Sequence, residues 1–132
     1  MKRVDIYFLL LATVLLLCGG GLGIKMGASE DFTLAPVHAH INLAGWASLA
    51  LFGLTYRAYP QLAERRVALF HFILSGSAAV LLPIGIGFAV LRNSPGLVMF
   101  ASTLWLIGVL MFLAQLVRLI RGRSVAVSPA AE

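Results

Sequence analysis

The sequence predicts an all-α integral membrane protein, folded as a four-helix bundle with both termini in the cytoplasm. Hydrophobic residues make up 61% of the 132-residue chain, charged residues only 11%, and the mean hydropathy is +0.98. A soluble domain of this length is far more polar. Four apolar runs approach or exceed the roughly 20 residues that an α-helix needs to cross a bilayer. The spans are predicted at residues 6–26, 37–56, 67–91 and 95–120.

The first apolar run follows a basic N-terminus, a pattern that can also belong to a secretory signal. The run is long for a signal and contains no A-x-A cleavage site, and Leu17 precedes Cys18 where a lipoprotein signal would need a small residue. We therefore expect a retained first span. Cys18 is the single cysteine of the sequence, which excludes a disulfide or a cysteine-based metal cluster within one chain.

The second span begins in the sequence APVHAHINLAGW, residues 35–46, which carries His38 and His40 in its first helical turn. Pro36 suits this position, because the N–H that proline lacks is not needed in the first turn of a helix. Imidazoles are costly in hydrocarbon, so a histidine pair at the start of a span suggests a functional role.

The third span carries His71 in its first turns, near the membrane surface opposite to the histidine pair. At 1.5 Å per residue the two levels differ by roughly 18 Å, so one chain cannot bring all three imidazoles to one metal ion. We expect His71 to lie in the wet headgroup region beside Arg65 and Arg66. After the fourth span, residues 124–132 are expected to form a short flexible tail.

The net charge of +5 does not indicate nucleic-acid binding, because the basic residues are confined to short segments between apolar runs. Cytoplasmic loops of membrane proteins carry an excess of lysine and arginine. Lys25 and Arg92 fall on one side of the predicted topology, and eight basic residues fall on the other. This asymmetry predicts a multi-pass protein of the inner (cytoplasmic) membrane with cytoplasmic termini. The eight are Lys2, Arg3, Arg57, Arg65, Arg66, Arg118, Arg121 and Arg123.

The two histidines of the pair should point in nearly opposite directions, because residues two apart on a helix are separated by about 200°. They cannot chelate one metal ion together, but each can serve a ligand on its own side of the helix. Both faces carry small or flat residues near the histidine, which would let a planar macrocycle lie against the backbone. The His38 face continues with Asn42, Gly45 and Leu49, and the His40 face with Ala44, Ala47 and Leu51.

Heme b is the cofactor that this composition fits best. The predicted membrane region has no cluster of Asp, Glu or Cys that could ligate an iron–sulfur cluster or a carboxylate-rich metal site. Heme needs one or two axial ligands, an apolar slot and cationic groups for its propionates. Solvated histidines and interfacial basic anchors are the alternative interpretation. The candidate cofactor-binding residues are His38, His40, Asn42, Gly45, Lys25 and Arg92, with His38 and His40 as candidate metal ligands.

The segment HAHINLAGWASLALFGLTYRAYP, residues 38–60, resembles the histidine-bearing helices of the catalytic subunit of the heme-copper oxidase superfamily, which includes cytochrome c oxidases and nitric oxide reductases. In that family one helix carries an H-x-H pair whose imidazoles ligate two hemes from opposite faces. Another carries a heme-ligating histidine, followed by an apolar, glycine-containing helix that ends in aromatic and basic residues. The corresponding residues here are Gly45, Phe52, Gly53, Tyr56 and Arg57.

The organisation of the chain is similar to that family as well. The twelve-helix subunit looks like three four-helix units about a pseudo-threefold axis, and the second helix of each unit carries histidine near the outer side. This chain resembles one such unit. The resemblance implies a homo-oligomer with ligand slots between protomers, for which a homotrimer is favoured and a dimer is the alternative. In one arrangement His40 of one protomer and His38 of its neighbour reach the same heme.

The resemblance does not extend to the copper site. The family's copper site takes three histidines and, in the oxidases, a tyrosine cross-linked to one of them. No such histidine set exists within this chain, and Tyr7, Tyr56 and Tyr59 all fall towards the cytoplasmic side of the predicted topology. Reduction of oxygen to water is therefore not expected, and no catalytic residue is assigned.

Together these features predict a small cytochrome-like membrane hemoprotein that binds heme b near the outer leaflet. A bis-imidazole site would suit electron transfer with an unidentified redox partner, whereas a five-coordinate site would leave a position for O2 or NO. Two alternatives stay open: a cofactor-free accessory or assembly subunit of a respiratory complex, and a copper or zinc site between subunits. A transporter is disfavoured, because no charged residue falls near the predicted mid-membrane level.

Overall fold

The computed structural model describes residues 3–63 and 66–124, and every regular element within these ranges is helical. Three helices are long and apolar enough to cross a membrane, and they cover Val4–Ser29, Arg66–Arg92 and Gly96–Arg121. The all-α prediction is therefore confirmed, and the three apolar helices support a membrane-embedded protein. The elements are α1 (Val4–Ser29), α2 (Ala35–His40), the π-helix η1 (Ile41–Ser48), α3 (Leu49–Ala58), α4 (Pro60–Ala63), α5 (Arg66–Arg92) and α6 (Gly96–Ser124).

A short turn joins α1 to α2. Glu30, at φ 55°, ends α1 in the left-handed conformation that often terminates helices. In the loop that follows, Oδ1 of Asp31 accepts hydrogen bonds from the N–H of Thr33 (2.9 Å) and from its hydroxyl (2.6 Å). These bonds stabilise the carboxylate and lower the pKa of Asp31. Pro36 then lies in the first turn of α2, as predicted.

The elements α2, η1 and α3 follow one another without a break, so residues 35–58 form one continuous helical rod. The predicted span 37–56 lies inside this rod, but the change to π-helical geometry was not predicted. The wider π turn lets the Ser48 hydroxyl donate to the carbonyl of Leu43, five residues earlier, at 2.8 Å. The rod ends before Pro60, which opens the short helix α4.

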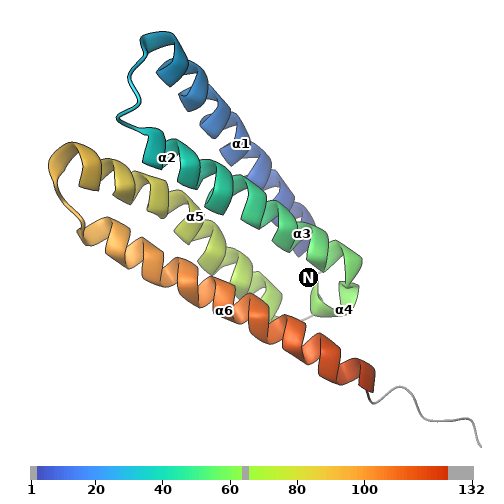
Figure 1. Ribbon diagram of the computed structural model, residues 1–132. Helices are drawn as coiled ribbons and strands as arrows, with labels where there is room; N and C mark the ends of the chain where they lie inside the picture. The colour runs from blue at the N-terminus through green and yellow to red at the C-terminus, as the bar shows by residue number, and fades with distance from the viewer. Residues whose placement is uncertain (1–2, 64–65, 125–132) are drawn as a thin grey trace, which may run out of the picture.

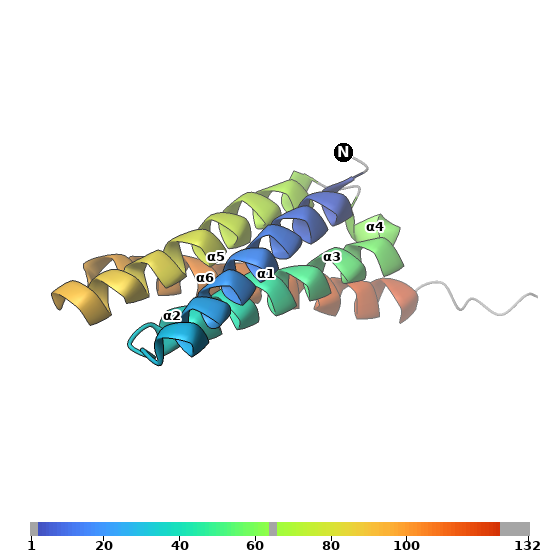
Figure 2. The same ribbon diagram turned by 90° about the horizontal axis from the view of Figure 1, so that it is seen from above.

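In the view of Figure 1 the rod is drawn between α1 and α5, with α6 beyond α5, and α1 and α5 also contact each other directly. The most extensive contacts join α5 to α6, and α1 packs along η1 and α3. Seen from above, α1 and α5 lie in front of α6 (Figure 2). α1 begins and α6 ends at the end of the molecule that carries α4, which we call the α4 end. The α1–α2 and α5–α6 connections lie at the opposite end, the loop end.

The described basic residues fall into the two groups expected from the sequence. Lys25 and Arg92 lie near the loop end, and the larger group lies near the α4 end. In the larger group Arg57 pairs with the buried carboxylate of Asp5 on α1 at 3.4 Å. Outside the described part of the chain are Lys2, Arg65, the side chain of Arg123 and residues 125–132. Ser124, the first residue of the predicted tail, belongs to α6. The described members of the larger group are Arg3, Arg57, Arg66, Arg118 and Arg121.

Two buried clusters hold the helices together. In the larger one the Phe8 ring of α1 lies 5.8 Å from that of Phe52, 5.6 Å from that of Tyr56 and 5.1 Å from that of Phe72, between ring centroids. Aromatic pairs at such distances add to the stability that burial alone provides. The smaller cluster joins the rod to α5 and α6 and contains small residues that allow close helix approach. Its buried members are Ala44, Leu82, Ile86 and Ala101.

Candidate functional site

His38 lies half-buried between α2 and α1. Its Nδ1 is 2.9 Å from the backbone oxygen of Gly19. A carbonyl oxygen can only accept, so Nδ1 carries the proton and Nε2 carries the lone pair. A Cβ added at Gly23 would lie only 2.8 Å from Cε1 of His38. The imidazole therefore rests against the bare backbone of α1.

Asn42 occupies the next turn on the same side of the rod. Its amide donates to the carbonyl of His38 at 2.9 Å, and its Nδ2 is 3.4 Å from Nε2 of the His38 ring. A Cβ at Gly19 would lie 2.7 Å from the same Nδ2. Gly19 and Gly23, one turn apart on α1, thus make room for the two polar side chains. We call these four residues, His38, Asn42, Gly19 and Gly23, the α1–α2 seam.

Gly45 faces α1 and leaves no open slot on this side. A Cβ at Gly45 would lie 2.9 Å from Cδ1 of Leu15. His38, Asn42 and Gly45 therefore lie on one face of the rod, as their spacing predicted. α1 covers that face, so the macrocycle expected beside Gly45 would have to displace Leu15.

His40 lies on the opposite side and is exposed. Its Nδ1 is 2.8 Å from the backbone oxygen of Pro36, which again places the proton on Nδ1 and the lone pair on Nε2. Within the described ranges, Nε2 of His40 makes no hydrogen bond. Histidines that ligate metals commonly hold their other ring N–H on a carbonyl in this way. His40 therefore presents a free imidazole nitrogen at the protein surface.

Arg92 and Lys25, the predicted propionate partners, are both exposed near the loop end. The Arg92 guanidinium lies 5.8 Å from the centroid of the Phe88 ring. Arg92 also lines a shallow apolar groove of about 240 Å³ along α5. Of the contacts described in residues 3–63 and 66–124, none joins Arg92 or Lys25 to either histidine of α2.

His71 is fully buried, so the expectation of a wet headgroup environment was wrong. Gln115 of α6 donates to Oη of Tyr56 at 2.6 Å, and Oη lies 2.9 Å from Nδ1 of His71. Because Tyr56 accepts from Gln115, its own hydroxyl proton is free to bond to His71. The His71 ring stacks on Phe112 at 5.7 Å and lies 4.9 Å from Phe52, between ring centroids. A chain of hydrogen bonds thus links α6, α3 and α5.

Beyond this chain, two polar atoms of α5 are buried without a regular hydrogen bond. They are Nε2 of His71 and Oγ of Ser75, and both face the backbone of Gly108. A Cβ at Gly108 would collide with the Ser75 hydroxyl, so only glycine lets α6 approach α5 this closely here. Nothing in the sequence alone shows that Tyr56, His71 and Gln115 meet. A glutamine within an apolar span does indicate that its amide needs a hydrogen-bond partner.

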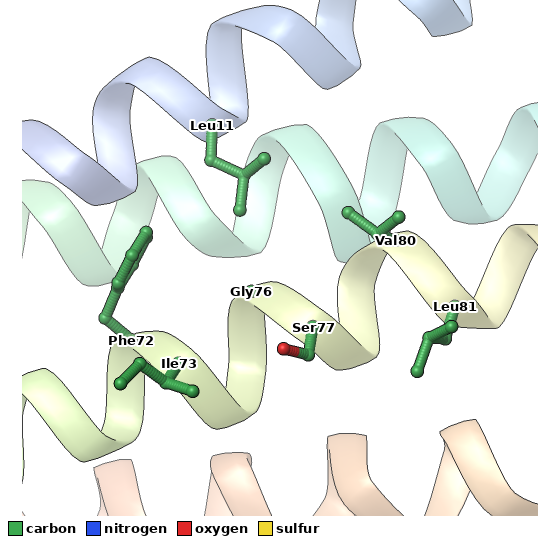
Figure 3. Close-up of a pocket in the computed structure, with 7 residues that line it drawn as sticks. All are labelled: Leu11, Phe72, Ile73, Gly76, Ser77, Val80 and Leu81. Carbon is green, nitrogen blue, oxygen red and sulfur yellow. The ribbon is translucent and has the colours of Figure 1, made fainter.

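A wider groove of about 500 Å³ runs between α1 and α5 (Figure 3). The Ser77 hydroxyl is the only polar side-chain group among the residues drawn there. None of the predicted site residues lines this groove, and its apolar walls are ordinary for a surface that meets lipid. The lining residues are Leu11, Phe72, Ile73, Gly76, Ser77, Val80 and Leu81.

The described residues contain no group of three or more His, Cys, Asp or Glu side chains that could hold a metal ion. The structure thus keeps His38, His40 and His71 in three separate environments. Comparison with known protein families, with curated proteins and with solved structures gave no match for this chain.

Proposed function

We propose that the protein is a small membrane hemoprotein that binds heme b through the histidine pair of α2. The observation that supports this most is the hydrogen bond that each imidazole of the pair makes to a backbone carbonyl. His38 and His40 each hold Nδ1–H on a backbone carbonyl, at 2.9 and 2.8 Å, so each has its lone pair on Nε2. This is the form of histidine that coordinates iron. Bound heme would supply a redox-active iron at this site.

The proposal treats the rod of residues 35–58 as a fourth span beside α1, α5 and α6. At about 1.5 Å per residue the rod is about 35 Å long, enough for a hydrocarbon core of roughly 30 Å. The excess of arginine near the α4 end favours a cytoplasmic location for that end and for both termini. The histidine pair would then lie near the outer leaflet of the inner membrane, where an imidazole is less costly than at the bilayer centre.

The number of imidazoles on the iron decides the chemistry. One imidazole leaves a position open for O2 or NO, and two favour electron transfer with a redox partner. The similarity of residues 38–60 to the heme-copper oxidase superfamily supports heme over other cofactors and favours a homotrimer. Copper chemistry of that family is not proposed, because the described residues contain no three-ligand group.

A hemin titration of the detergent-purified apoprotein tests this proposal. We expect a Soret band that saturates with added hemin in the wild-type protein and in Ile24→Ala, a control at an exposed position of α1. The double variant His38→Ala/His40→Ala should show no saturable band. Saturable binding by the double variant would contradict the proposal.

The titration also separates the two alternatives. A wild-type protein without a saturable Soret band would favour either a copper or zinc site or a cofactor-free accessory subunit. Metal analysis of the same sample distinguishes them, because only the first would retain copper or zinc in a histidine-dependent manner.

A further inference from the structure

The groove between α1 and α5 has two exposed arginines beyond its α4 end. Its lining is apolar apart from the Ser77 hydroxyl, and its volume is about 500 Å³ (Figure 3). Arg3 directly precedes α1 and Arg66 opens α5, so both lie past the same end of the groove. We propose that the groove binds one phospholipid with an anionic headgroup, its acyl chain along the groove and its phosphate at the two arginines. The proposal goes beyond heme binding and does not depend on it.

The length of the groove matches an acyl chain in one leaflet of a membrane. On α5 the groove extends from Phe72 to Leu81, about 14 Å at a rise of 1.5 Å per residue. One leaflet supplies about half of a hydrocarbon core that is roughly 30 Å thick. Arg66 lies about 9 Å before Phe72 along the helix, at the level of the headgroups when the groove lies in hydrocarbon. Arg66 and Ser77 share one face of α5, because eleven residues are about three turns.

Tyr7 connects the arginines to the groove on the side of α1. The backbone oxygen of Arg3 accepts from the N–H of Tyr7 at 3.3 Å, so the two residues are one turn apart. Leu11, which lines the groove, lies one further turn along the same face. The Tyr7 ring is 5.8 Å from that of Phe72, between centroids, and is 40% exposed. A tyrosine between apolar and basic residues is typical of the membrane interface.

The charge beyond the groove favours an anionic headgroup. Both arginine side chains are exposed, and neither makes an ion pair within residues 3–63 and 66–124. Of the described acidic residues, Asp5 lies at this end of the molecule and pairs with Arg57. Arginine can bind a phosphate through two N–H groups, and basic residues at a membrane surface attract anionic lipids. A choline group would bring a further positive charge beside the arginines, so a zwitterionic lipid fits less well.

Native mass spectrometry of the full-length protein in detergent tests the headgroup with two lipids that share palmitoyl and oleoyl chains. We expect phosphatidylglycerol to bind at one site about tenfold more tightly than phosphatidylcholine. Arg3→Gln/Arg66→Gln should reduce this preference to less than about twofold. Arg118→Gln/Arg121→Gln is the matched control and should keep the preference, because it removes the same charge near the same end, from exposed positions on α6.

Substitutions that fill the groove test the position of the acyl chain. Ser77→Trp and Val80→Phe place larger side chains at exposed positions of the lining, and each should weaken the binding of both lipids severalfold. Val109→Phe, on α6 outside the groove, is the matched control, because Val109 and Val80 are equally exposed (38%). Circular dichroism identifies the variants that fold, and two groove variants keep the test valid when one of them does not.

Each contrary outcome removes a different part of the proposal. Equal binding of the two lipids by the wild-type protein would overturn the anionic headgroup. The same loss of preference in both arginine double variants would overturn the assignment to Arg3 and Arg66. Unchanged lipid binding in the folded groove variants would overturn the role of the groove. A wild-type dimer that binds neither lipid, and that Ser77→Trp converts to single chains, would assign the groove to a second copy instead. None of these outcomes bears on heme binding.

Discussion

At the scale of single residues, hydrogen-bond partners decide what each histidine can do. The spacing of His38 and His40 correctly predicted that they lie on opposite faces of one helix. The two histidines differ in exposure because α1 covers His38, where Gly19 and Gly23 leave room for the side chains on that face of the rod. Local sequence does not predict which distant segments pack together. The same reason explains the wrong expectation for His71, which is buried by its contacts with Tyr56 and with rings from three other helices.

The Tyr56–His71–Gln115 chain of hydrogen bonds should contribute measurably to stability. Tyr56→Phe keeps the ring but leaves Nδ1 of His71 and the Gln115 amide without their shared partner. We expect the free energy of unfolding in detergent to fall by about 1–3 kcal/mol. Tyr7→Phe, at a ring that is 40% exposed, is the matched control and should change it by less than about 0.5 kcal/mol. Equal effects of the two substitutions would show that the buried chain contributes nothing specific.

At the scale of elements, the apolar runs predicted helices well, because a long run that crosses a bilayer must satisfy its backbone internally. The helices extend a few residues past the predicted limits at most ends, since turns at the membrane surface tolerate polar residues such as Lys25 and Ser29. The π-helix η1 was not predicted, because the residues INLAGWAS carry no signal that separates a π from an α turn. Its place directly after the histidine pair is notable, since π turns occur frequently at functional sites.

Close contact between α5 and α6 should depend on Gly85. A Cβ at Gly85 would lie 2.6 Å from the backbone nitrogen of Val98, and backbone cannot move aside as a flexible side chain can. Gly85→Ala should therefore destabilise the protein by about 1–3 kcal/mol, measured by thermal or denaturant unfolding in detergent. Gly27→Ala, with nothing within 4 Å of its Cβ, should be neutral or stabilising by up to about 1 kcal/mol. A neutral Gly85→Ala would mean that α5 and α6 are not packed as described.

At the scale of the whole molecule, the distribution of charge predicted which ends of the helices lie together. Arg3, Arg57 and Arg66 come from separate segments, and the structure places all three near the α4 end. The sequence could predict this because helices joined by short connections must run antiparallel. The sequence could not predict the α1–α2 seam or the groove between α1 and α5, because both depend on how each helix is rotated about its own axis relative to its neighbours.

Reporter fusions test the proposed orientation. Both termini should lie in the cytoplasm, because the α4 end carries most of the described arginines. Green fluorescent protein fused to either terminus should fluoresce, and alkaline phosphatase fused to either terminus should be inactive. Alkaline phosphatase inserted in the α1–α2 loop, next to Asp31, should be active and serves as the positive control. Active phosphatase at either terminus would contradict the orientation and move the histidine pair away from the outer leaflet.

The measurement that tests the central claim most directly is a reduced-minus-oxidised absorption spectrum of the protein purified from cells supplied with ample heme precursor. The account predicts a Soret band and sharp α and β bands for the wild-type protein, and none for His38→Ala/His40→Ala expressed at the same level. A featureless wild-type spectrum, or identical bands in the double variant, would contradict the claim that the histidines of α2 hold heme.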